Sequence, residues 1–391
     1  MPLNLVSATA HTPKQKKKQR RWRLLLWLMG SISGGLLLCG FGPPQLIDRT
    51  VAPTQRVTAA DVQQQVGNPN LEGLTAKAFL LYDVDADRTL FAKNSDQPLP
   101  PASLTKLMTS LLVLEKGNLA DSVTIQAADL VGGSSMGLKA GETLTVEQLL
   151  WGLLIPSGND AATALARHQE GAVNAFVQQM NARAAQLGLK QTHFTNPQGV
   201  DDNHLVASAN DLLILTRQNW AFPLFRTIVA TANTTVAGHD LQNTNELLGK
   251  TLNVKGVKTG TTDKAGECLI ANLQHGKHQV ITIVLDSRDR YSDTLTLDQV
   301  YQANYTWVDG DLQSMAMLNR LYAPDGTLWY LRATGAPPAL LVQRKDTVAL
   351  ETYRLLQLPP AGEPWQSGMT VGVLEWRLGD QMVHTQPLVL W

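Results

Sequence analysis

The pattern of hydrophobic and polar positions divides the chain into an N-terminal tail, an apolar run, a polar stretch and two folded parts. Residues 24–41 (LLLWLMGSISGGLLLCGF) contain no charged side chain, and residues 42–70 are rich in Pro, Gln and Asn. At a rise of about 1.5 Å per residue, the apolar run forms a helix of about 27 Å, enough to span the hydrocarbon core of a bilayer. The pattern therefore predicts a transmembrane anchor or signal segment at 24–41 and a stalk or linker at 42–70.

Residues 71–307 predict one domain in which an antiparallel sheet is combined with helices. Residues 78–83 and 89–91 are typical of a hairpin with its turn at 85–87. A helix is expected to begin near 101–103 and to end at Gly117. Further helices are expected at 146–154, 160–168, 171–187, 208–219 and 292–307, and strands at 252–261, 268–274 and 280–286.

The remaining part, residues 308–391, alternates short apolar segments with Pro and Gly turns. The segments are LWYLRA, ALLVQR, TVALETY, VGVLEWRL and VHTQPLVLW. This spacing predicts a small, separate all-β domain at the C-terminus. The expected fold class is therefore α/β in the broad sense (α+β), with an antiparallel sheet and a helical region, plus a C-terminal all-β domain.

The charged residues balance overall but are distributed unevenly. The chain has 33 basic and 33 acidic residues, so its composition implies no affinity of the whole chain for nucleic acid. Residues 1–23, however, form a basic tail that ends before the first acidic residue, Asp48. Because these cations precede the apolar run, the positive-inside rule places the tail in the cytoplasm and the rest outside the plasma membrane.

The apolar run is longer than the core of a signal peptide, and the CGFGPP that follows offers no A-x-A cleavage pattern. We therefore favour an uncleaved anchor over a signal peptide, whose removal would leave a secreted protein. The sequence Leu36-Leu37-Leu38-Cys39 also suggests a lipoprotein box, although Leu38 is bulkier than the residue such boxes carry.

The two cysteines, Cys39 and Cys268, exclude a disulfide scaffold and a four-cysteine zinc site. A bridge between them is not expected, because Cys39 lies in the apolar run.

Three short motifs carry the candidate chemistry. The first, Ser103-Leu104-Thr105-Lys106, lies at the start of a predicted helix, where an i, i+3 spacing puts serine and lysine on one face. A serine hydroxyl becomes a nucleophile when an adjacent base takes its proton, and a lysine with a depressed pKa can be that base. Taken alone, the motif also fits a capping serine beside a solvated lysine.

The second motif is Ser157-Gly158-Asn159, between two predicted helices. Its hydroxyl can relay a proton, and its amide can bind a substrate carbonyl and Lys106; a plain turn is the alternative.

The third motif is Lys258-Thr259-Gly260, on a predicted strand. Its lysine can hold a carboxylate with help from the threonine, and its glycine allows a substrate backbone to approach; a solvated strand lysine is the alternative.

The motifs in this order, together with YDVDADRTLFAKNSDQPLPPASLTKLMT, GSSMGLKAGETLTVEQLLWGLLIPSGNDAA, LGLKQTHFTNPQGVDD and NVKGVKTGTTDKAGECLIA, resemble the penicillin-binding, serine-type D-alanyl-D-alanine carboxypeptidases. The resemblance covers roughly residues 75–307, and the β-rich tail is similar to the C-terminal domain of that family. It implies the penicillin-binding, β-lactamase-like transpeptidase fold.

The resemblance also implies a mechanism. Ser103 attacks the carbonyl between the two terminal D-alanines of a peptidoglycan stem peptide, and Lys106 is the base. Ser157 and Asn159 complete the proton and hydrogen-bond network. The terminal carboxylate, which β-lactams mimic, is bound by Lys258 and Thr259, with Gly260 beside them. The oxyanion lies between the backbone N–H groups of Ser103 and Thr261. β-Lactams acylate Ser103, and neither a metal nor another cofactor is needed.

Two features depart from the family pattern. Gln198 stands where many relatives carry His, so it receives no catalytic role here. Many members end in an amphipathic helix, whereas this chain stops in its last predicted strand, which makes the N-terminal segment a candidate anchor in place of that helix. Four other histidines lack a paired carboxylate at readable spacing and are interpreted as structural or surface residues: His168, His193, His204 and His239.

Alternative functions remain open at this point. A D,D-endopeptidase or weak transpeptidase would use the same fold and motifs. A serine β-lactamase would need a glutamate that activates water for deacylation, and no loop of the sequence supplies it convincingly. A non-catalytic wall-binding protein would be a degenerate form of the enzyme.

Overall fold

The computed structural model describes residues 71–391 except 72, 252, 311–318, 337 and 361. The described residues divide into two compact units, with the division between Thr306 and Trp307. The predicted tail, apolar run and stalk lie outside the described residues. None of the helices in the described part of the chain combines the length and the apolar character that crossing a bilayer requires.

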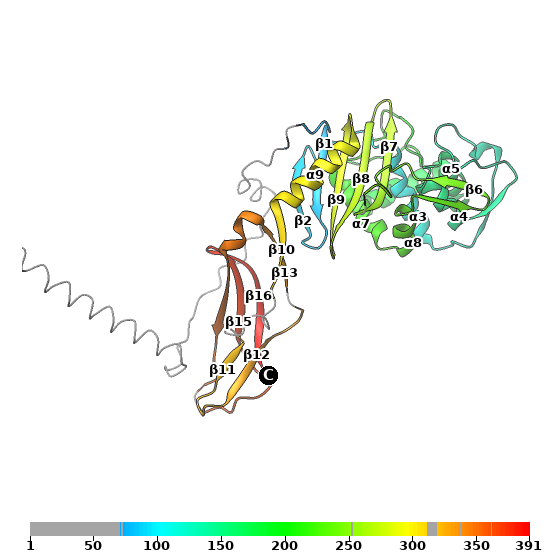
Figure 1. Ribbon diagram of the computed structural model, residues 1–391. Helices are drawn as coiled ribbons and strands as arrows, with labels where there is room; N and C mark the ends of the chain where they lie inside the picture. The colour runs from blue at the N-terminus through cyan, green and yellow to red at the C-terminus, as the bar shows by residue number, and fades with distance from the viewer. Residues whose placement is uncertain (1–70, 72, 252, 311–318, 337, 361) are drawn as a thin grey trace, which may run out of the picture. The chain divides into compact units, whose positions relative to one another are not determined.

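The larger unit is built on an antiparallel sheet whose strands follow the order β2-β1-β9-β8-β7. The strands are β1 (Ala78–Asp83), β2 (Arg88–Lys93), β7 (Val254–Thr262), β8 (Gly266–His275) and β9 (His278–Ser287). All six residues of β1 are buried, because helices cover both faces of the sheet. Helix α9 (Arg290–Asn304) lies across one face, and α7 (Ala209–Trp220) packs on the other (Figure 1).

The other helices and short hairpins of this unit extend beyond the sheet at its β7 side (Figure 1). The helices are α3 (Lys106–Lys116), α4 (Val146–Leu154), α5 (Asn159–Glu170), α6 (Val173–Gln186) and α8 (Pro223–Val229), with a 3₁₀ turn, η3, at Ala127–Asp129. The hairpins are β3 (Ser122–Thr124) with β4 (Thr143–Thr145) and β5 (Asn233–Val236) with β6 (His239–Gln242).

The predicted elements of this unit are confirmed, with shifts at their ends. The last helix was expected at 292–307 but begins at Arg290, because the Asp289 side chain accepts a hydrogen bond from the backbone of Ser292 and caps the helix there. It ends at Asn304, and the next residues form strand β10 (Tyr305–Asp309). The sequence did not predict α8 or the two small hairpins, whose short strands carry too few residues for a clear alternation.

The helix expected near 101–103 starts as a 3₁₀ turn, η2 (Ala102–Thr105), and continues as α3. Such turns are common at the first turn of an α-helix. Gly117 ends α3 as predicted: it adopts a left-handed conformation with φ of 76° and donates its N–H to the carbonyl of Val113.

The smaller unit is all-β, as predicted. Its main sheet has the order β11-β12-β16-β15-β14, and a second sheet pairs β10 with β13. The strands are β11 (Arg320–Tyr322), β12 (Leu328–Ala333), β13 (Ala339–Gln343), β14 (Leu350–Leu356), β15 (Thr370–Leu378) and β16 (Gln381–Leu390). The segment TVALETY is only partly a strand: a 3₁₀ helix, η5 (Arg344–Ala349), precedes β14, and the Thr347 hydroxyl donates to the carbonyl of Arg344 within it.

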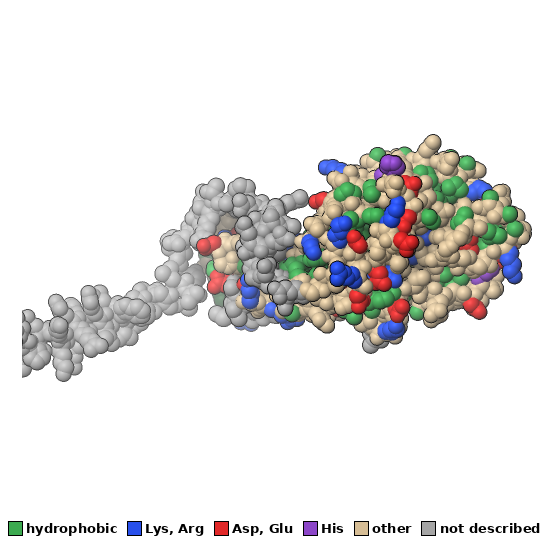
Figure 2. Space-filling model, turned by 90° about the horizontal axis from the view of Figure 1, so that it is seen from above, with side chains coloured by type: hydrophobic (Ala, Val, Ile, Leu, Met, Phe, Trp, Pro, Cys, Tyr) green, Lys and Arg blue, Asp and Glu red, His purple; other side chains and the backbone are tan. Residues whose placement is uncertain are grey.

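The surface shown in Figure 2 carries cationic and anionic side chains interspersed over the larger unit. This face therefore presents no extended field of one sign that would steer a polyanion.

Candidate active site

Ser103 and Lys106 are brought together by the turn η2. In a 3₁₀ helix, side chains at i and i+3 lie directly above one another. The Lys106 amine nitrogen is accordingly 2.9 Å from the Ser103 hydroxyl oxygen. Lys106 is fully buried, whereas Ser103 is half-buried and so accessible to a ligand.

Two further oxygens contact the Lys106 amine. The side-chain carbonyl of Asn159 lies 2.8 Å away, and the backbone carbonyl of Gln198 lies 2.7 Å away. Burial and the neighbouring Lys258 hold the pKa of Lys106 well below its ordinary value, although Asp160 acts in the opposite direction. A neutral amine has two N–H donors and one lone pair, so with Asn159 and Gln198 accepting, its lone pair faces the Ser103 hydroxyl.

Ser157 and Asn159 lie at the start of α5. Asn159 is fixed on its other side, because its amide nitrogen donates to the carbonyl of Gly132 at 2.8 Å and its backbone N–H donates to the carbonyl of Ser134 at 2.7 Å. Ser157 has a φ of 63°, an uncommon conformation for a residue other than glycine. Its buried hydroxyl has no hydrogen-bond partner among the described residues. Unpaired buried hydroxyls and strained backbone positions cluster at functional sites, so Ser157 is a candidate site residue.

Asp160 secures the loop that faces Asn159. Its carboxylate accepts hydrogen bonds from the backbone N–H groups of Met136 at 3.1 Å and Leu138 at 3.2 Å. It also accepts one from the Ser135 hydroxyl at 2.5 Å. These bonds keep the loop, and with it the carbonyls that hold Asn159, in one arrangement.

Lys258 is only 1% exposed, which excludes the interpretation of a solvated strand lysine. Its amine donates to the carbonyl of Thr259 at 3.1 Å. Burial, with the nearby charge of Arg290, lowers the pKa of Lys258 to about 7. The Thr259 hydroxyl lies 2.5 Å from that of Thr244, which follows the β5–β6 hairpin.

Gly260 serves the protein's own packing. A Cβ atom at this position would lie 3.0 Å from the carbonyl oxygen of Pro101, 3.1 Å from the Cβ of Ala102 and 3.2 Å from the backbone nitrogen of Ser103. From the sequence, we expected this glycine to let a substrate backbone approach the strand. In the structure its first consequence is the close approach of β7 to η2, which places the third motif beside the first.

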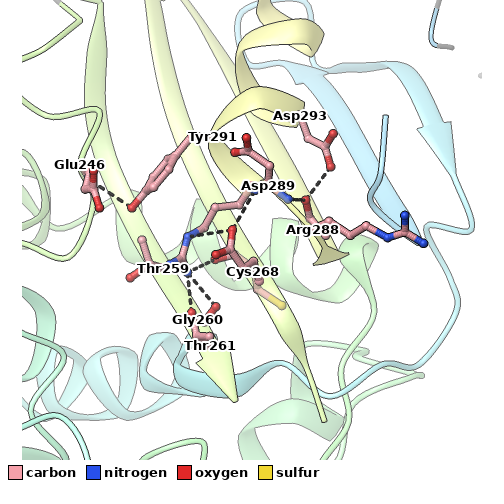
Figure 3. Close-up of polar contacts among 12 residues, drawn as sticks. Glu246, Thr259, Gly260, Thr261, Cys268, Arg288, Asp289, Tyr291 and Asp293 are labelled. Carbon is pink, nitrogen blue, oxygen red and sulfur yellow. Dashed lines mark hydrogen bonds and ion pairs between the residues drawn. The ribbon is translucent and has the colours of Figure 1, made fainter. Parts of the chain in front are cut away.

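Arg290, at the start of α9, is a candidate site residue that the sequence analysis missed. Its guanidinium donates to the Thr261 hydroxyl at 2.7 Å and to the carbonyl of Gly260 at 3.0 Å. The two acceptor residues, Gly260 and Thr261, lie side by side in Figure 3. Next to it, Tyr291 donates to the carbonyl of Thr244 at 2.9 Å. The contact joins residues about thirty positions apart, so no local pattern could reveal it.

The histidines in the described part of the chain do not contact Ser103 or Lys106. Two of the four that were interpreted as structural or surface residues have a carboxylate partner that is distant in the sequence. His239 lies 2.6 Å from Glu142, 97 residues away in the sequence. His168 lies 3.7 Å from Asp121. Both contacts depend on the fold, which is why spacing in the sequence could not show them. Cys268 is a buried free thiol, whereas Cys39 lies outside the described residues.

Comparisons with known proteins place this chain in a family. The sequence profile of the D-alanyl-D-alanine carboxypeptidases matches residues 62–289. The chain is 31% identical to the D-alanyl-D-alanine carboxypeptidase DacC of Escherichia coli K12 over 353 residues, which cover 85% of this chain and 87% of that protein. It is 32% identical to a D-alanyl-D-alanine endopeptidase of Pseudomonas aeruginosa over 244 residues, covering 60% of this chain and 78% of that protein.

Among solved structures, penicillin-binding protein 5 of Haemophilus influenzae matches with a TM-score of 0.63 and 29% identity, covering 83% of this chain and 98% of that one. The matches therefore extend into both folded units, and the profile match spans the positions of the three motifs. The chain belongs to the D-alanyl-D-alanine carboxypeptidase family of penicillin-binding serine peptidases.

Proposed function

We propose that Ser103 is the nucleophile and Lys106 the base of a D,D-carboxypeptidase that removes the terminal D-Ala from peptidoglycan stem peptides. The observation that carries this assignment is the distance of 2.9 Å between the Ser103 hydroxyl and a fully buried amine with a lowered pKa. A base must be neutral to accept a proton and must lie within hydrogen-bond reach of the group it activates. Lys106 meets the distance condition, and burial beside Lys258 lowers its pKa and so favours the neutral form.

In the acylation step, the Ser103 oxygen bonds to the carbonyl carbon while its proton passes to Lys106. The C–N bond to the terminal D-Ala then breaks, and its nitrogen takes a proton from Lys106 through the Ser157 hydroxyl. The unpartnered Ser157 hydroxyl supports this relay, because it can accept and donate when substrate arrives. Water then hydrolyses the acyl-enzyme and restores Ser103.

The cationic side chains beside β7 suit the negative terminal carboxylate of the substrate. We assign Lys258, Thr259 and Thr261 to the terminal carboxylate, with Arg290 adding positive charge beside Thr261. The oxyanion of the tetrahedral intermediate is assigned to the backbone N–H groups of Ser103 and Thr261. The close packing at Gly260 supports this assignment, since it holds β7 against the backbone of Ser103.

The test uses the full chain in detergent, incubated with a fluorescent penicillin and separately with an acyl-D-Ala-D-Ala peptide. Stable labelling of Ser103 and release of one D-Ala per peptide are expected. Rapid turnover of penicillin without stable label would indicate a β-lactamase instead. No reaction with either compound would leave a non-catalytic wall-binding protein.

A D,D-endopeptidase or weak transpeptidase is the second candidate function, favoured by the similarity to the endopeptidase of Pseudomonas aeruginosa. The chemistry at Ser103 would be the same, but the leaving amine would belong to a cross-linked neighbouring peptide. Digestion of cross-linked and uncross-linked wall fragments separates the two functions. Release of D-Ala without loss of cross-links supports the carboxypeptidase.

We further propose that residues 24–41 anchor the protein in the bacterial plasma membrane, with residues 1–23 in the cytoplasm and both folded units outside. The uncharged run and the basic residues before it support this topology. The test compares the wild type with a variant carrying Leu36→Arg and Leu37→Arg. Retention of the wild type in washed membranes and release of the variant are expected; equal retention of both would contradict the anchor.

A further inference from the structure

Gln198, to which the sequence assigned no catalytic role, has a defined place in the structure. Its backbone carbonyl accepts a hydrogen bond from Lys106, and its side-chain nitrogen donates to the Thr163 hydroxyl at 2.6 Å. Gln198 is 8% exposed and Thr163 is 5% exposed. Buried polar side chains of this kind hold each other firmly when every donor and acceptor among them has a hydrogen-bond partner.

We propose that Gln198 and Thr163 are positioning residues that close a ring of hydrogen bonds around the Lys106 amine. Thr163 lies one turn after Asn159 on α5, and its hydroxyl donates to the backbone carbonyl of Asn159 at 2.8 Å. The same hydroxyl accepts from the Gln198 side chain. The ring then runs from Lys106 to Asn159, through Thr163 to Gln198, and back to Lys106.

The donors and acceptors of the ring determine which side chains can complete it. The Thr163 proton is committed to the carbonyl of Asn159, so the hydroxyl can only accept from a partner across the site. Gln198 supplies that donor through its amide N–H. A side chain of similar length without an N–H group leaves the hydroxyl with an unsatisfied acceptor and the ring open.

The backbone on both sides of Gln198 is held independently of the ring. The carbonyl of Pro197 accepts from the Thr109 hydroxyl at 2.7 Å, and the N–H of Gly199 donates to the Asn196 side chain at 2.7 Å. Gly199 also packs directly on η2, because a Cβ atom there would lie 2.0 Å from the carbonyl oxygen of Ala102. The segment is thus anchored to the helices that carry Ser103 and Lys106, and the ring fixes it to α5.

The ring couples the two groups that accept the protons of the Lys106 amine. When Asn159 and Gln198 keep their places, the remaining lone pair is directed at the Ser103 hydroxyl. This inference rests on the proposed role of Lys106 as base. Small misplacements of a reacting group reduce rates strongly, so an open ring is expected to slow acylation while leaving ligand binding intact.

The test measures acylation of the full chain by a fluorescent penicillin, with the rate constant for acylation separated from the dissociation constant of the initial complex. The variants are Thr163→Val, Gln198→Met, the two combined, and Thr163→Ser, which keeps the hydroxyl. The matched control is Thr216→Val, because Thr216 is also a buried helical threonine whose hydroxyl donates one turn back, to Leu212 at 2.7 Å.

We expect Thr163→Val and Gln198→Met each to reduce the acylation rate constant about tenfold, with an unchanged dissociation constant and complete labelling at the endpoint. The double variant should lose no more than either single one, because either substitution opens the same ring. Thr163→Ser should restore the rate, and Thr216→Val should match the wild type.

Two outcomes overturn the proposal. One is an acylation rate in Thr163→Val equal to that of the wild type. The other is an equal loss in Thr163→Val and Thr216→Val, which would reflect general packing of helical threonines. Failure of the proposed function itself would look different, since the wild-type chain would then not be labelled at all.

Discussion

Gly260 on β7 and Ser103 on η2 are in such close contact that a Cβ atom on the glycine would lie 3.2 Å from the serine's backbone nitrogen. The strand that carries the proposed carboxylate-binding residues is therefore packed directly on the turn that carries the proposed nucleophile. A side chain on this residue would be in tighter contact with η2 than Cβ atoms usually are, so the relative position of the two motifs depends on this glycine.

Gly260→Ala is expected to push η2 away from β7 and to slow acylation by about tenfold or more. Overpacking of this kind also reduces the free energy of unfolding by about 1–3 kcal/mol. Adding Ala102→Gly should restore part of the rate, because it removes one of the three atoms that the new Cβ meets. Penicillin acylation rates and thermal unfolding check both effects, and unchanged acylation in Gly260→Ala would contradict this account.

Ser103→Ala is expected to abolish covalent penicillin binding and release of D-Ala, since it removes the proposed nucleophile. The fold should persist, because Ser103 is half-buried at the site. Ser110→Ala is the control: its hydroxyl donates to Asn219 at 2.7 Å, and losing that bond costs about 1 kcal/mol of stability without removing the nucleophile. Gel fluorescence and circular dichroism measure the two effects. Retained label on the Ser103→Ala variant would refute the assignment.

Lys106→Arg is expected to reduce acylation by about 10²–10⁴-fold, because a guanidinium stays protonated and cannot accept the serine proton. Initial binding of penicillin should change less, since the positive charge is retained. Lys250→Arg, at an exposed ion pair with Glu246, is a control for the substitution type and should behave as the wild type. Stopped-flow acylation separates binding from the chemical step. A rate within a few-fold of the wild type would show that another group is the base.

The pKa of about 7 at Lys258 predicts a pH dependence of substrate recognition. Lys258 must be protonated to attract a carboxylate, so kcat/KM for a peptide with a free terminal carboxylate should fall as the pH rises through about 7. In Lys258→Arg this alkaline limb should move to higher pH, because arginine stays charged. A peptide amide, which lacks the carboxylate, should show a weaker dependence. Identical profiles for the acid and the amide would contradict the assignment of Lys258.

The local part of this site could be predicted from the sequence, because neighbours along the chain define it. Ser103 and Lys106 are one turn apart in any helical conformation, and the sheet strands are long enough for their alternation to be recognised. The sequence also indicated the glycine stop at Gly117. Even here the turn at residues 102–105 is a 3₁₀ turn and not the expected start of an α-helix. It packs on Gly199 and Gly260, which are distant in the sequence, so the local pattern could not indicate it.

The nonlocal part could not be predicted from spacing. Arg290 reaches Thr261 only because α9 follows β9 back across the sheet. Gln198 meets Thr163 only because the loop that carries it, between α6 and α7, lies against α5. Neither contact has a motif, and both involve residue types that are usually solvated. Gln198 received no catalytic role because it departs from the histidine of the family pattern, and its contacts became visible only in the structure.

The buried lysines predict how stability depends on pH. The pKa of Lys258 falls from an ordinary 10.5 to about 7 on folding, so between these values the unfolded chain binds more protons than the folded one. The free energy of unfolding should therefore rise with pH across that window, and the penalty of burying the charge is fully present below about pH 7. Lys106, whose pKa is also lowered, contributes with the same sign.

In Lys258→Met the rise in the free energy of unfolding between about pH 7 and pH 10 should be smaller, because one titrating group is lost. Urea unfolding at several pH values in both proteins measures the slopes, and equal slopes would mean that Lys258 keeps an ordinary pKa in the folded protein.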